Sequence, residues 1–274
     1  MNPEALAALC AAAMPEERLT PEELAYLCFG TSAEGDNDEI FGDERGAAVM
    51  QIQRFDSHVA AWLVLVAVQP GAQSRGLGQA LVRAVIDRAA QLGAHDVLLA
   101  SAIPRYIWPG VDTANTRAGM LFESLGFERD WVGTNMTIDT SFRKPPPDGI
   151  TVEFETGSGA HDFAASAFPH WIPELDRAVE LGTAVAARAA DGRTVGFSCH
   201  SVNRAGWIGP MATDPTLQHG GVGSAVLAAV CADLERRGSA TGEISWVSNL
   251  RFYGKCGARV SRVFLGGRRK LKPN

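Results

Sequence analysis

The clearest pattern in the chain is an arrangement of apolar and polar positions that occurs twice. Residues 66–93 read VAVQPGAQSRGLGQALVRAVIDRAAQLG, and residues 211–238 read MATDPTLQHGGVGSAVLAAVCADLERRG. After the glycines of each segment, apolar residues recur at helical spacing, and an apolar run precedes each proline. This predicts a strand, a glycine-rich turn and an amphipathic helix in both segments. Gly93 and Gly238 are typical of helix ends.

The two segments match residue by residue at a constant separation of 145 residues. The matched pairs are Pro70 with Pro215, Gln73 with Gln218, Gly76 with Gly221, and Gly78 with Gly223. An internal repeat of this kind predicts two similar domains. The stretch SFRKPPPDG at 141–149 holds three consecutive prolines and favours a stiff linker. We therefore expect an N-terminal domain at 1–140, a linker at 141–149 and a C-terminal domain at 150–274.

The other apolar runs predict strands on both sides of each glycine-rich turn. They lie at 46–55, 58–68, 95–102 and 131–139, and at 150–155, 184–190, 194–201, 206–212 and 242–247. Helices are expected at about 4–14, 21–29, 158–166 and 173–181. Strands before a crossover helix and one strand after it predict an α+β fold. Each half would have a mixed, mostly antiparallel central sheet flanked by helices.

The amino-acid composition limits the kinds of binding partner that we expect. The formal net charge of −6 argues against nucleic acid, which binds through Lys and Arg, and suits a cationic small molecule as well as simple solubility. The basic C-terminal stretch GGRRKLKPN is expected to be a solvated tail. No spacing of His, Cys and Asp suits a metal.

The cysteines and the apolar runs indicate in which cellular compartment the protein is expected. Five cysteines, an odd number without a C-x-x-C pair, predict free thiols in a reducing compartment. The run at 59–68 is too short to span a membrane, and the first residues do not resemble a signal peptide. We expect a cytoplasmic protein with no membrane partner, as a monomer or homodimer.

A glycine-rich turn that opens a helix is suited to bind phosphate. The backbone can approach a ligand closely there, and the first N–H groups of the helix carry partial positive charge. The pairs Gln79-Ala80 and Ser224-Ala225 differ from the Lys-Ser/Thr of a P-loop. Val82 and Leu227 stand where a dinucleotide fold has Gly or Ala. The pattern therefore indicates a different pyrophosphate ligand.

The motif Q-x-x-G-x-G, found at 73–78 and 218–223 after a strand and a proline, resembles the acyl-CoA loop of the GNAT superfamily of N-acyltransferases. NLRFYGKCGARVSRVF at 249–264 resembles the last helix and strands of that family, and NTRAGMLFESLGFERDW at 115–131 is its N-terminal counterpart. The resemblance covers nearly the whole chain as a tandem pair. It implies acetyl-CoA as cofactor, with contacts from Met211, Thr213, Gln218, His219, Gly220, Gly221, Val222, Gly223, Ser224, Asn249, Gln73, Arg75, Gly76 and Gly78.

Within that set, the resemblance implies that Met211 and Thr213 contact the cofactor through their backbones. Pro210 cannot donate a hydrogen bond, and we expect it to mark a bulge in this strand. Asn249 is either a contact of the cofactor arm or the N-cap of the last helix.

The same resemblance distinguishes the two halves. Aligning Gly126 with Gly257 places Phe122 on Tyr253 and leaves fourteen extra residues in the first half, roughly 104–117. Family members use a Tyr here to protonate the departing thiolate, which fits reference pKa values of about 10 for a phenol and about 8.5 for a thiol. We therefore expect the second domain to be catalytic, with Tyr253 as general acid rather than a core aromatic.

Within the extra residues, Tyr106 is a conceivable alternative acid or a surface aromatic. The segment YIWPGVD around it is suited to line a pocket.

The base and the acceptor stay open at this point. Glu243, His200, His170, Glu174 or water alone are candidates for the base. The tandem arrangement is similar to bacterial acetyltransferases of glucosamine and glucosaminides, which implies a small-molecule amine such as an amino sugar or aminoglycoside. His170, Trp171, His200, Trp207 and Trp246 are wall candidates, the last two more typical of a core. The alternatives are a polyamine, an amino acid, a peptide or protein amine, or a non-catalytic acyl-CoA-binding sensor.

Overall fold

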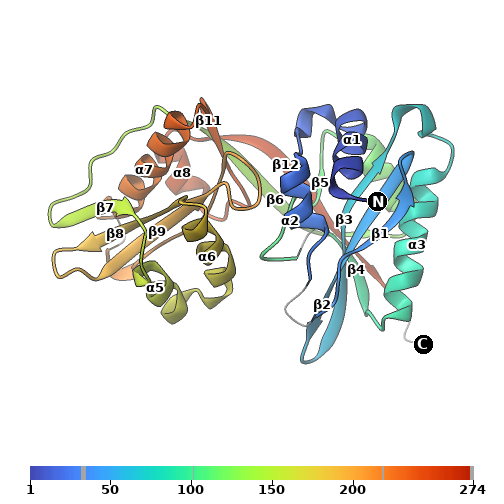
Figure 1. Ribbon diagram of the computed structural model, residues 1–274, viewed down its shortest axis with the longest axis horizontal. Helices are drawn as coiled ribbons and strands as arrows, with labels where there is room; N and C mark the ends of the chain where they lie inside the picture. The colour runs from blue at the N-terminus through green and yellow to red at the C-terminus, as the bar shows by residue number, and fades with distance from the viewer. Residues whose placement is uncertain (32–34, 101, 218, 272–274) are drawn as a thin grey trace. The chain divides into compact units, whose positions relative to one another are not determined.

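The computed structural model describes residues 1–31, 35–100, 102–217 and 219–271. The chain divides into two compact units, of which unit 1 comprises Met1–Gly133 with Val263–Asn274 and unit 2 comprises Thr134–Arg262. Each unit is a sheet with helices on both faces (Figure 1). In the described part of the chain no helix is long and apolar enough to cross a bilayer.

Unit 1 is built on an antiparallel meander followed by a parallel strand. The meander is β1 (Glu39–Asp43), β2 (Gly46–Phe55) and β3 (His58–Val68). After the crossover helix α3 (Leu77–Gln91), β4 (Asp96–Leu99) pairs in parallel with β3. The sheet continues with the last part of β12 (Arg259–Lys270), which also pairs with β5 (Val111–Asp112), and with the first part of β6 (Glu128–Asp139).

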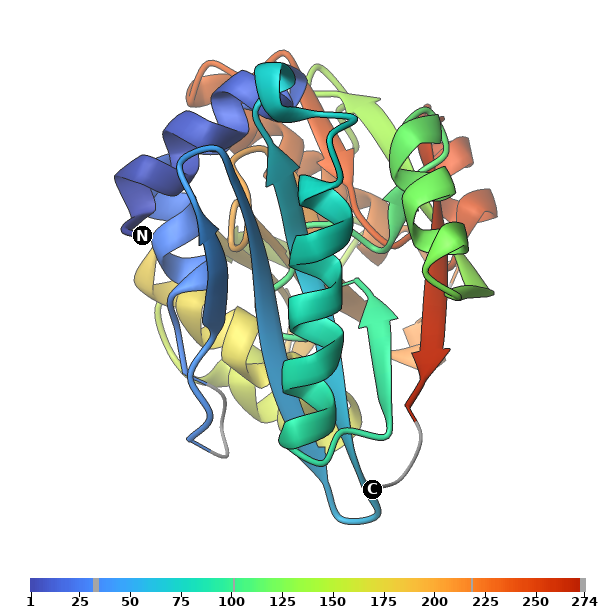
Figure 2. The same ribbon diagram turned by 90° about the vertical axis from the view of Figure 1, so that its right-hand side faces the viewer.

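Alternation along β2 sorts the core of unit 1 into two layers, because successive side chains of a strand point to opposite faces. Ala48 and Met50 pack in one cluster with α3 and with α4 (Thr116–Ser124). Ala47 and Val49 pack on the other face with α1 (Pro3–Ala13) and α2 (Pro21–Cys28). Figure 2 shows α3 lying along its face of this sheet.

Unit 2 has the same plan. Its strands β7 (Ile150–Phe154), β8 (Ala184–Ala189), β9 (Thr194–His200) and β10 (Trp207–Thr213) are antiparallel neighbours. After the crossover helix α7 (Val222–Arg236), β11 (Thr241–Ile244) pairs in parallel with β10 and leads to α8 (Leu250–Lys255). The helix α7 covers one face, and α5 (Gly159–Ala167) and α6 (Ile172–Glu180) cover the other.

The remaining helices are four short 3₁₀ turns among the described residues: η1 (Pro15–Glu17), η2 (Pro70–Ala72), η3 (Pro169–Trp171) and η4 (Pro215–Leu217). The α+β prediction, with a mixed and mostly antiparallel sheet flanked by helices, is confirmed, but the strands of the two halves belong to one continuous sheet rather than to two separate ones. The strands β1 and β5 were not expected, and the basic C-terminal stretch is not a solvated tail, because its first residues belong to β12.

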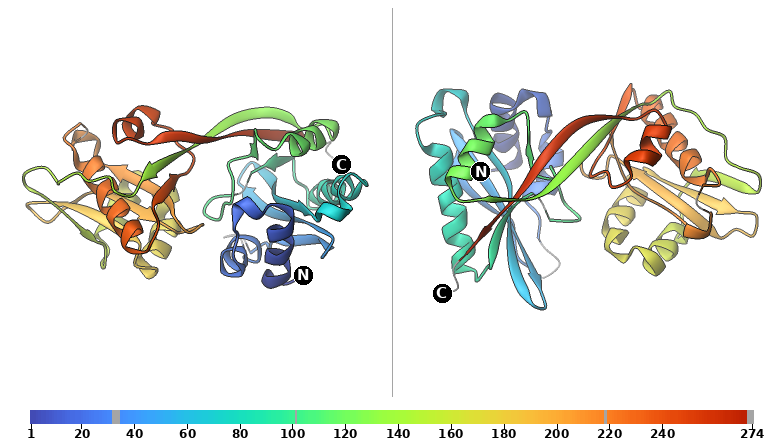
Figure 3. Two further views of the ribbon diagram at one scale, coloured as in Figure 1. Left: turned by 90° about the horizontal axis from the view of Figure 1, so that it is seen from above. Right: turned by 180° about the vertical axis from the view of Figure 1, so that it is seen from behind.

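The strands β6 and β12 each begin in one unit and end in the other (Figure 3). In unit 1, Arg268 of β12 pairs with Leu98 of β4. In unit 2, Thr137 of β6 pairs with Glu243 of β11. Each sheet therefore receives one strand from the other half of the sequence. The proline-rich residues 141–149 contain no helix or strand and join β6 to β7 within unit 2. Unit 2 is one continuous stretch of the chain, whereas unit 1 combines two separate stretches.

Candidate functional site

The sheet of unit 2 opens between β10 and β11. The described parallel ladder between them consists of the pairs Trp207–Glu243 and Ile208–Ile244. Beyond Ile208, β10 continues along β9 as far as Thr213. The register shifts between Ile208 and Met211, so Gly209 and Pro210 form a bulge, as expected at this proline. The bulge and the end of the ladder coincide, which leaves one edge of β10 facing the opening.

That edge of β10 presents backbone N–H groups. The N–H of Asp214 donates to the carbonyl of Val195 on β9, with 2.8 Å between nitrogen and oxygen. Because hydrogen bonds alternate along an antiparallel ladder, Ala212 also faces β9, whereas Met211 and Thr213 turn their N–H and C=O groups the other way. Both N–H groups therefore point into the opening, where an extended ligand can accept from them.

The glycine-rich loop after β10 places a helix N-terminus beside the opening. Gly221 is the N-cap of α7 with φ of 91° and ψ of −7°, and His219 has φ of 66°. The first intrahelical bond runs from Ala225 N–H to Gly221 C=O, so the preceding N–H groups of the first turn lack partners within the helix. Their partial positive charge suits an anion. Gln218 lies outside the described residues.

The loop of unit 1 has the same backbone conformation. Gly76, the N-cap of α3, has φ of 84° and ψ of −7°, and Ser74 has φ of 60°. The side-chain amide of Gln73 donates to the carbonyl of Val68 at 3.0 Å and accepts from the Arg117 guanidinium at 3.0 Å. The glutamine of the motif therefore ties this loop to the end of its strand. Arg75 is exposed on the same loop.

The glycine after the N-cap allows three elements to meet. A methyl group added at Gly223 would lie 3.2 Å from the Thr213 hydroxyl, 3.4 Å from Met211 Cε and 3.4 Å from the Phe252 ring. Thus β10, α7 and α8 approach one another at this residue. The matching methyl at Gly78 in unit 1 would contact Leu121 at 3.5 Å.

Tyr253 lies on α8 with its hydroxyl 4.0 Å from the Met211 sulfur. Its ring packs edge-on against Phe252, with 4.9 Å between ring centroids. Burial raises the pKa of Tyr253 to about 12, and the nearby Cys256 thiol adds to this, so the phenol keeps its proton at neutral pH. The counterpart in unit 1, Phe122, is buried against Phe127 and has no proton to donate.

Asn249 is the N-cap of α8. Its side-chain oxygen accepts from the Phe252 N–H at 3.0 Å. Of the two roles expected for Asn249, cofactor contact or helix N-cap, the structure therefore shows the N-cap. Ser224, in the first turn of α7, lies 3.6 Å from the Cys256 sulfur, measured from its hydroxyl oxygen.

The four candidate bases have different surroundings. His200 is fully buried, bonded to Asp233 of α7 at 2.8 Å, and desolvation lowers its pKa. Glu174 is buried on α6 and accepts from the Asn203 side chain at 3.2 Å. His170 is exposed in η3. Glu243 lies opposite Trp207, one residue before the last described pair of the β10–β11 ladder, beyond which the sheet opens.

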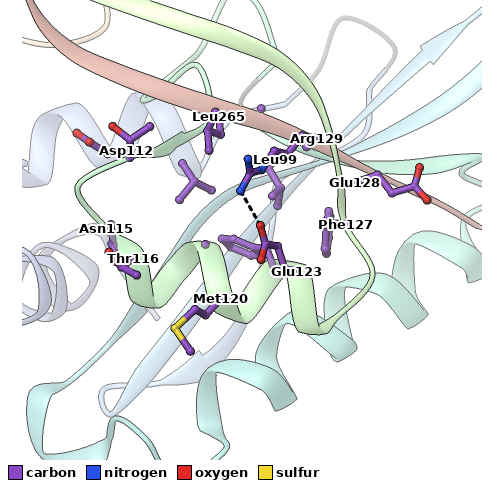
Figure 4. A pocket seen from close by; sticks show the side chains of 16 residues that line it. Leu99, Asp112, Asn115, Thr116, Met120, Glu123, Phe127, Glu128, Arg129 and Leu265 are labelled. Atoms are coloured by element: carbon purple, nitrogen blue, oxygen red, sulfur yellow. Dashed lines mark hydrogen bonds and ion pairs between the residues drawn. The ribbon is translucent and has the colours of Figure 1, made fainter.

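The extra residues of the first half belong to unit 1. Tyr106 is 8% exposed, so the expectation of a surface aromatic is wrong, because the neighbouring Ile107 anchors the segment in the core beneath α1 and α2. The segment after it forms β5 and the start of α4. It lines a cavity of about 240 Å³ together with β4 and β12 (Figure 4). An ion pair of 2.9 Å joins Glu123 and Arg129 at this cavity.

The described residues contain no group of three or more His, Cys, Asp or Glu side chains placed to hold a metal ion. Trp207 is buried, as expected for a core aromatic, and the Arg204 guanidinium lies 4.9 Å from its ring centroid. Sequence reasoning did not single out Asn135, a fully buried polar residue of β6 that bonds to Glu243.

Two family models match the chain, one over each repeat. The model described as "Acetyltransferase (GNAT) domain" matches residues 32–129, and the model "Acetyltransferase (GNAT) family" matches residues 152–258. Together they cover most of the chain, including both glycine-rich loops. No curated protein matches the sequence significantly.

Several solved structures share the fold over nearly the whole chain. A glucosamine N-acetyltransferase region of a fungal multi-domain β-N-acetylglucosaminidase has 20% identity and a TM-score of 0.73, covering 97% of this chain but 37% of that one. A tandem GNAT protein from the clavulanic acid biosynthesis pathway has 13% identity and a TM-score of 0.68, covering 100% and 98%. A GNAT protein from Sphaerobacter thermophilus has 19% identity and a TM-score of 0.64, covering 98% and 93%.

Proposed function

Because the chain belongs to the GNAT acetyltransferases, we propose that it transfers an acetyl group from acetyl-CoA to a primary amine of a small molecule, with the chemistry in unit 2. The observation that carries this assignment is the protonated Tyr253 hydroxyl beside Met211, at the opening between β10 and β11. Unit 1 has the same loop but Phe122 in place of the tyrosine.

The geometry of unit 2 supports an extended thioester ligand. The backbone N–H groups of Met211 and Thr213 would bind the amide-containing arm in the manner of an added strand. The loop residues Gly220 and Gly221 and the first turn of α7, from Val222 to Ser224, would bind the pyrophosphate, with the free backbone N–H groups of that turn and the helix dipole as the attractive groups. The corresponding loop of unit 1, with Gln73, Arg75, Gly76 and Gly78, would bind a second acyl-CoA without turnover.

Acetyl-CoA supplies the acetyl group as a thioester. As the new N–C bond forms, the C–S bond breaks and the sulfur needs a proton, which Tyr253 would donate. A phenol pKa of about 12 does not forbid this step. Burial also raises the pKa of the Cys231 thiol to about 12, so desolvation shifts thiols and phenols in the same direction.

For the acceptor we propose an amino sugar or an aminoglycoside. The support is the fold shared with the glucosamine N-acetyltransferase region, together with a net charge of −6 that suits a cationic amine. A peptide or protein amine is the alternative acceptor. An acyl-CoA sensor is the alternative function, and the Phe122 of unit 1 favours that role for unit 1 alone.

The test follows acetyl-CoA consumption as free thiol over glucosamine, glucosaminides, aminoglycosides, polyamines and short peptides. With the best acceptor, we expect Tyr253→Phe to lower kcat about 100-fold, within the range for general acid catalysis, at unchanged acetyl-CoA affinity. Tyr106→Phe, which removes a hydroxyl from unit 1, is the matched control and should keep kcat. Normal turnover of Tyr253→Phe would reject the acid assignment. Acetyl-CoA binding without turnover on any amine would favour the sensor.

A further inference from the structure

We propose that Glu243 is the general base of unit 2, and that Asn135, which β6 brings from the first half of the sequence, is its positioning residue. The proposal rests on the acetyl transfer proposed above. It concerns the step before bond formation, in which the acceptor must lose a proton from its ammonium group to expose the nitrogen lone pair. That proton would pass to the carboxylate of Glu243.

The direction of the Glu243 side chain follows from its neighbours on β11. A methyl added at Gly242 would contact Ile208 and Leu234, and Ile244 packs in the same cluster, so both residues face α7. Because side chains alternate along a strand, Glu243 points to the opposite face. Tyr253 packs in the cluster on the α7 side. A thioester held in the opening would therefore have a base on one face of the sheet and an acid on the other.

Asn135 holds Glu243 through a short hydrogen bond. Its side-chain N–H donates to one carboxylate oxygen of Glu243 at 2.6 Å, and its side-chain oxygen accepts from the Trp246 N–H at 3.1 Å. Asn135 is fully buried, so both halves of its amide are used within the protein. A charge-assisted bond of this kind fixes one oxygen of the carboxylate and thereby directs the other.

The same amide also orders the connection to the acid. Trp246 follows β11 with φ of 50°, in the left-handed region that bulky residues rarely adopt. The bond from its N–H to Asn135 holds this conformation. From Trp246 the chain leads through Asn249, the N-cap of α8, to Tyr253. The buried side chain of Asn135 thus orders both the Glu243 carboxylate and the turn that leads to α8, the helix that carries Tyr253.

The repeat shows what the other unit has at these positions. Glu243 corresponds to Leu98 at the separation of 145 residues, and Tyr253 corresponds to Phe122 at 131. At that second separation, Asn135 corresponds to Gly266. The register confirms the pairing, because Thr137 faces Glu243 in unit 2 and Arg268 faces Leu98 in unit 1. Unit 1 therefore lacks all three groups: the base, its positioning amide and the acid. If the Glu243–Asn135 pair were purely structural, there would be no reason for it to be absent from the same unit that lacks the acid.

The test by pH profile depends on which ionisable groups lie around Glu243. Its partners across the two ladders are Trp207 and Thr137, neither of which ionises near neutral pH. The Arg204 guanidinium, which lies 4.9 Å from the Trp207 ring centroid, carries a positive charge near these rungs. Asp139, which faces Thr241 two residues away on the same side of β11, is an ionisable group on them. It is exposed, and its hydrogen bond from Ser141 lowers its pKa, so it keeps a constant charge above about pH 5.

The decisive experiment compares pH profiles of kcat/KM for three variants with the best acceptor. Glu243→Gln keeps the shape of the side chain and should lower kcat/KM at least 100-fold, while the Kd of acetyl-CoA stays the same. Asn135→Asp replaces the donor by a second carboxylate and should move the acid limb of the profile to higher pH by at least about one unit. Glu243→Asp, the conservative variant, should retain part of kcat and the acid limb.

The matched control is Asn203→Asp, since Asn203 donates to the buried carboxylate of Glu174 in the same unit. It should lower thermal stability without moving the acid limb. Normal turnover of Glu243→Gln, or an equal shift of the limb in both asparagine variants, would overturn the proposal. If Asn135→Asp fails to fold, Glu243→Gln and Glu243→Asp decide alone. If the wild-type protein shows no turnover, the proposed function itself is contradicted. If Tyr253→Phe loses turnover but Glu243→Gln does not, only the present inference is contradicted.

Discussion

Alanine at the two N-cap glycines applies the same perturbation to both units. Gly76 and Gly221 share a left-handed conformation, with φ of 84° and 91° and ψ of −7° in both. An added Cβ at either residue would meet no atom within 4 Å. The effect of Gly76→Ala and Gly221→Ala is therefore purely on backbone conformation and should be equal, which makes them a matched pair.

The expected magnitude follows from that conformation. An L-residue in the left-handed region costs roughly 1–2 kcal/mol, part of which is offset because alanine also restricts the unfolded chain. A net loss of about 1 kcal/mol corresponds to a Tm lower by about 2–4 °C. If the loop relaxes instead of holding the strained conformation, the full strain of roughly 1–2 kcal/mol is lost from ligand binding, which weakens the Kd by roughly 5- to 30-fold.

The assay combines thermal unfolding, calorimetric titration with acetyl-CoA and kcat/KM for each variant. We expect Gly221→Ala to lower both acetyl-CoA affinity at one site and kcat/KM. Gly76→Ala should lower affinity at the other site and leave kcat/KM within about twofold, since unit 1 lacks the acid. If both the Tm and the acetyl-CoA affinity were unchanged in both variants, the loops would have relaxed without any effect on the ligand, and this would refute the reasoning.

Two further predictions concern buried groups. His200 is buried, and desolvation lowers its pKa, so the unfolded chain binds a proton at this residue at a higher pH than the folded protein does. Stability should therefore fall as the pH drops below about 6.5. Thermal scans from pH 8 to 5 should show a smaller decrease in Tm for His200→Gln than for the wild type. All five cysteines are free and buried, so a thiol reagent should react slowly with native protein and with five thiols after denaturation; rapid reaction of several thiols in the native state would contradict this burial.

Much of the fold could be predicted because the elements around each loop are locally encoded. The runs at 46–55 and 58–68 coincide with β2 and β3, since their apolar side chains match a strand buried on both faces. The short β1 was missed because EIFGD is partly polar and only half-buried at the edge of the sheet. The burial of Tyr106 was missed because its partners lie in other elements.

The strand β12 shows a limit of local patterns. Its residues Gly266 to Lys270 resemble a solvated basic tail, yet Arg268 forms ion pairs with Asp96 and Asp130. Those carboxylates lie far away in sequence, so no local window contains the partners that neutralise the charge. Asn135 was missed for the same reason, although a polar side chain within the strand-like run at 131–139 was a signal that could have been followed.

The exchange of β6 and β12 has a consequence for the order in which the protein can be made. Arg268 and its partner Asp96 are 172 residues apart, and at about 5–20 residues per second a ribosome needs roughly 10–30 s to synthesise that interval. During this time one edge of β4 stays unpaired, although β1, β2 and β3 already have all the neighbours that they have in the finished sheet. An open strand edge attracts other chains, so the period of synthesis, rather than the folded state, is when this protein is most exposed to aggregation.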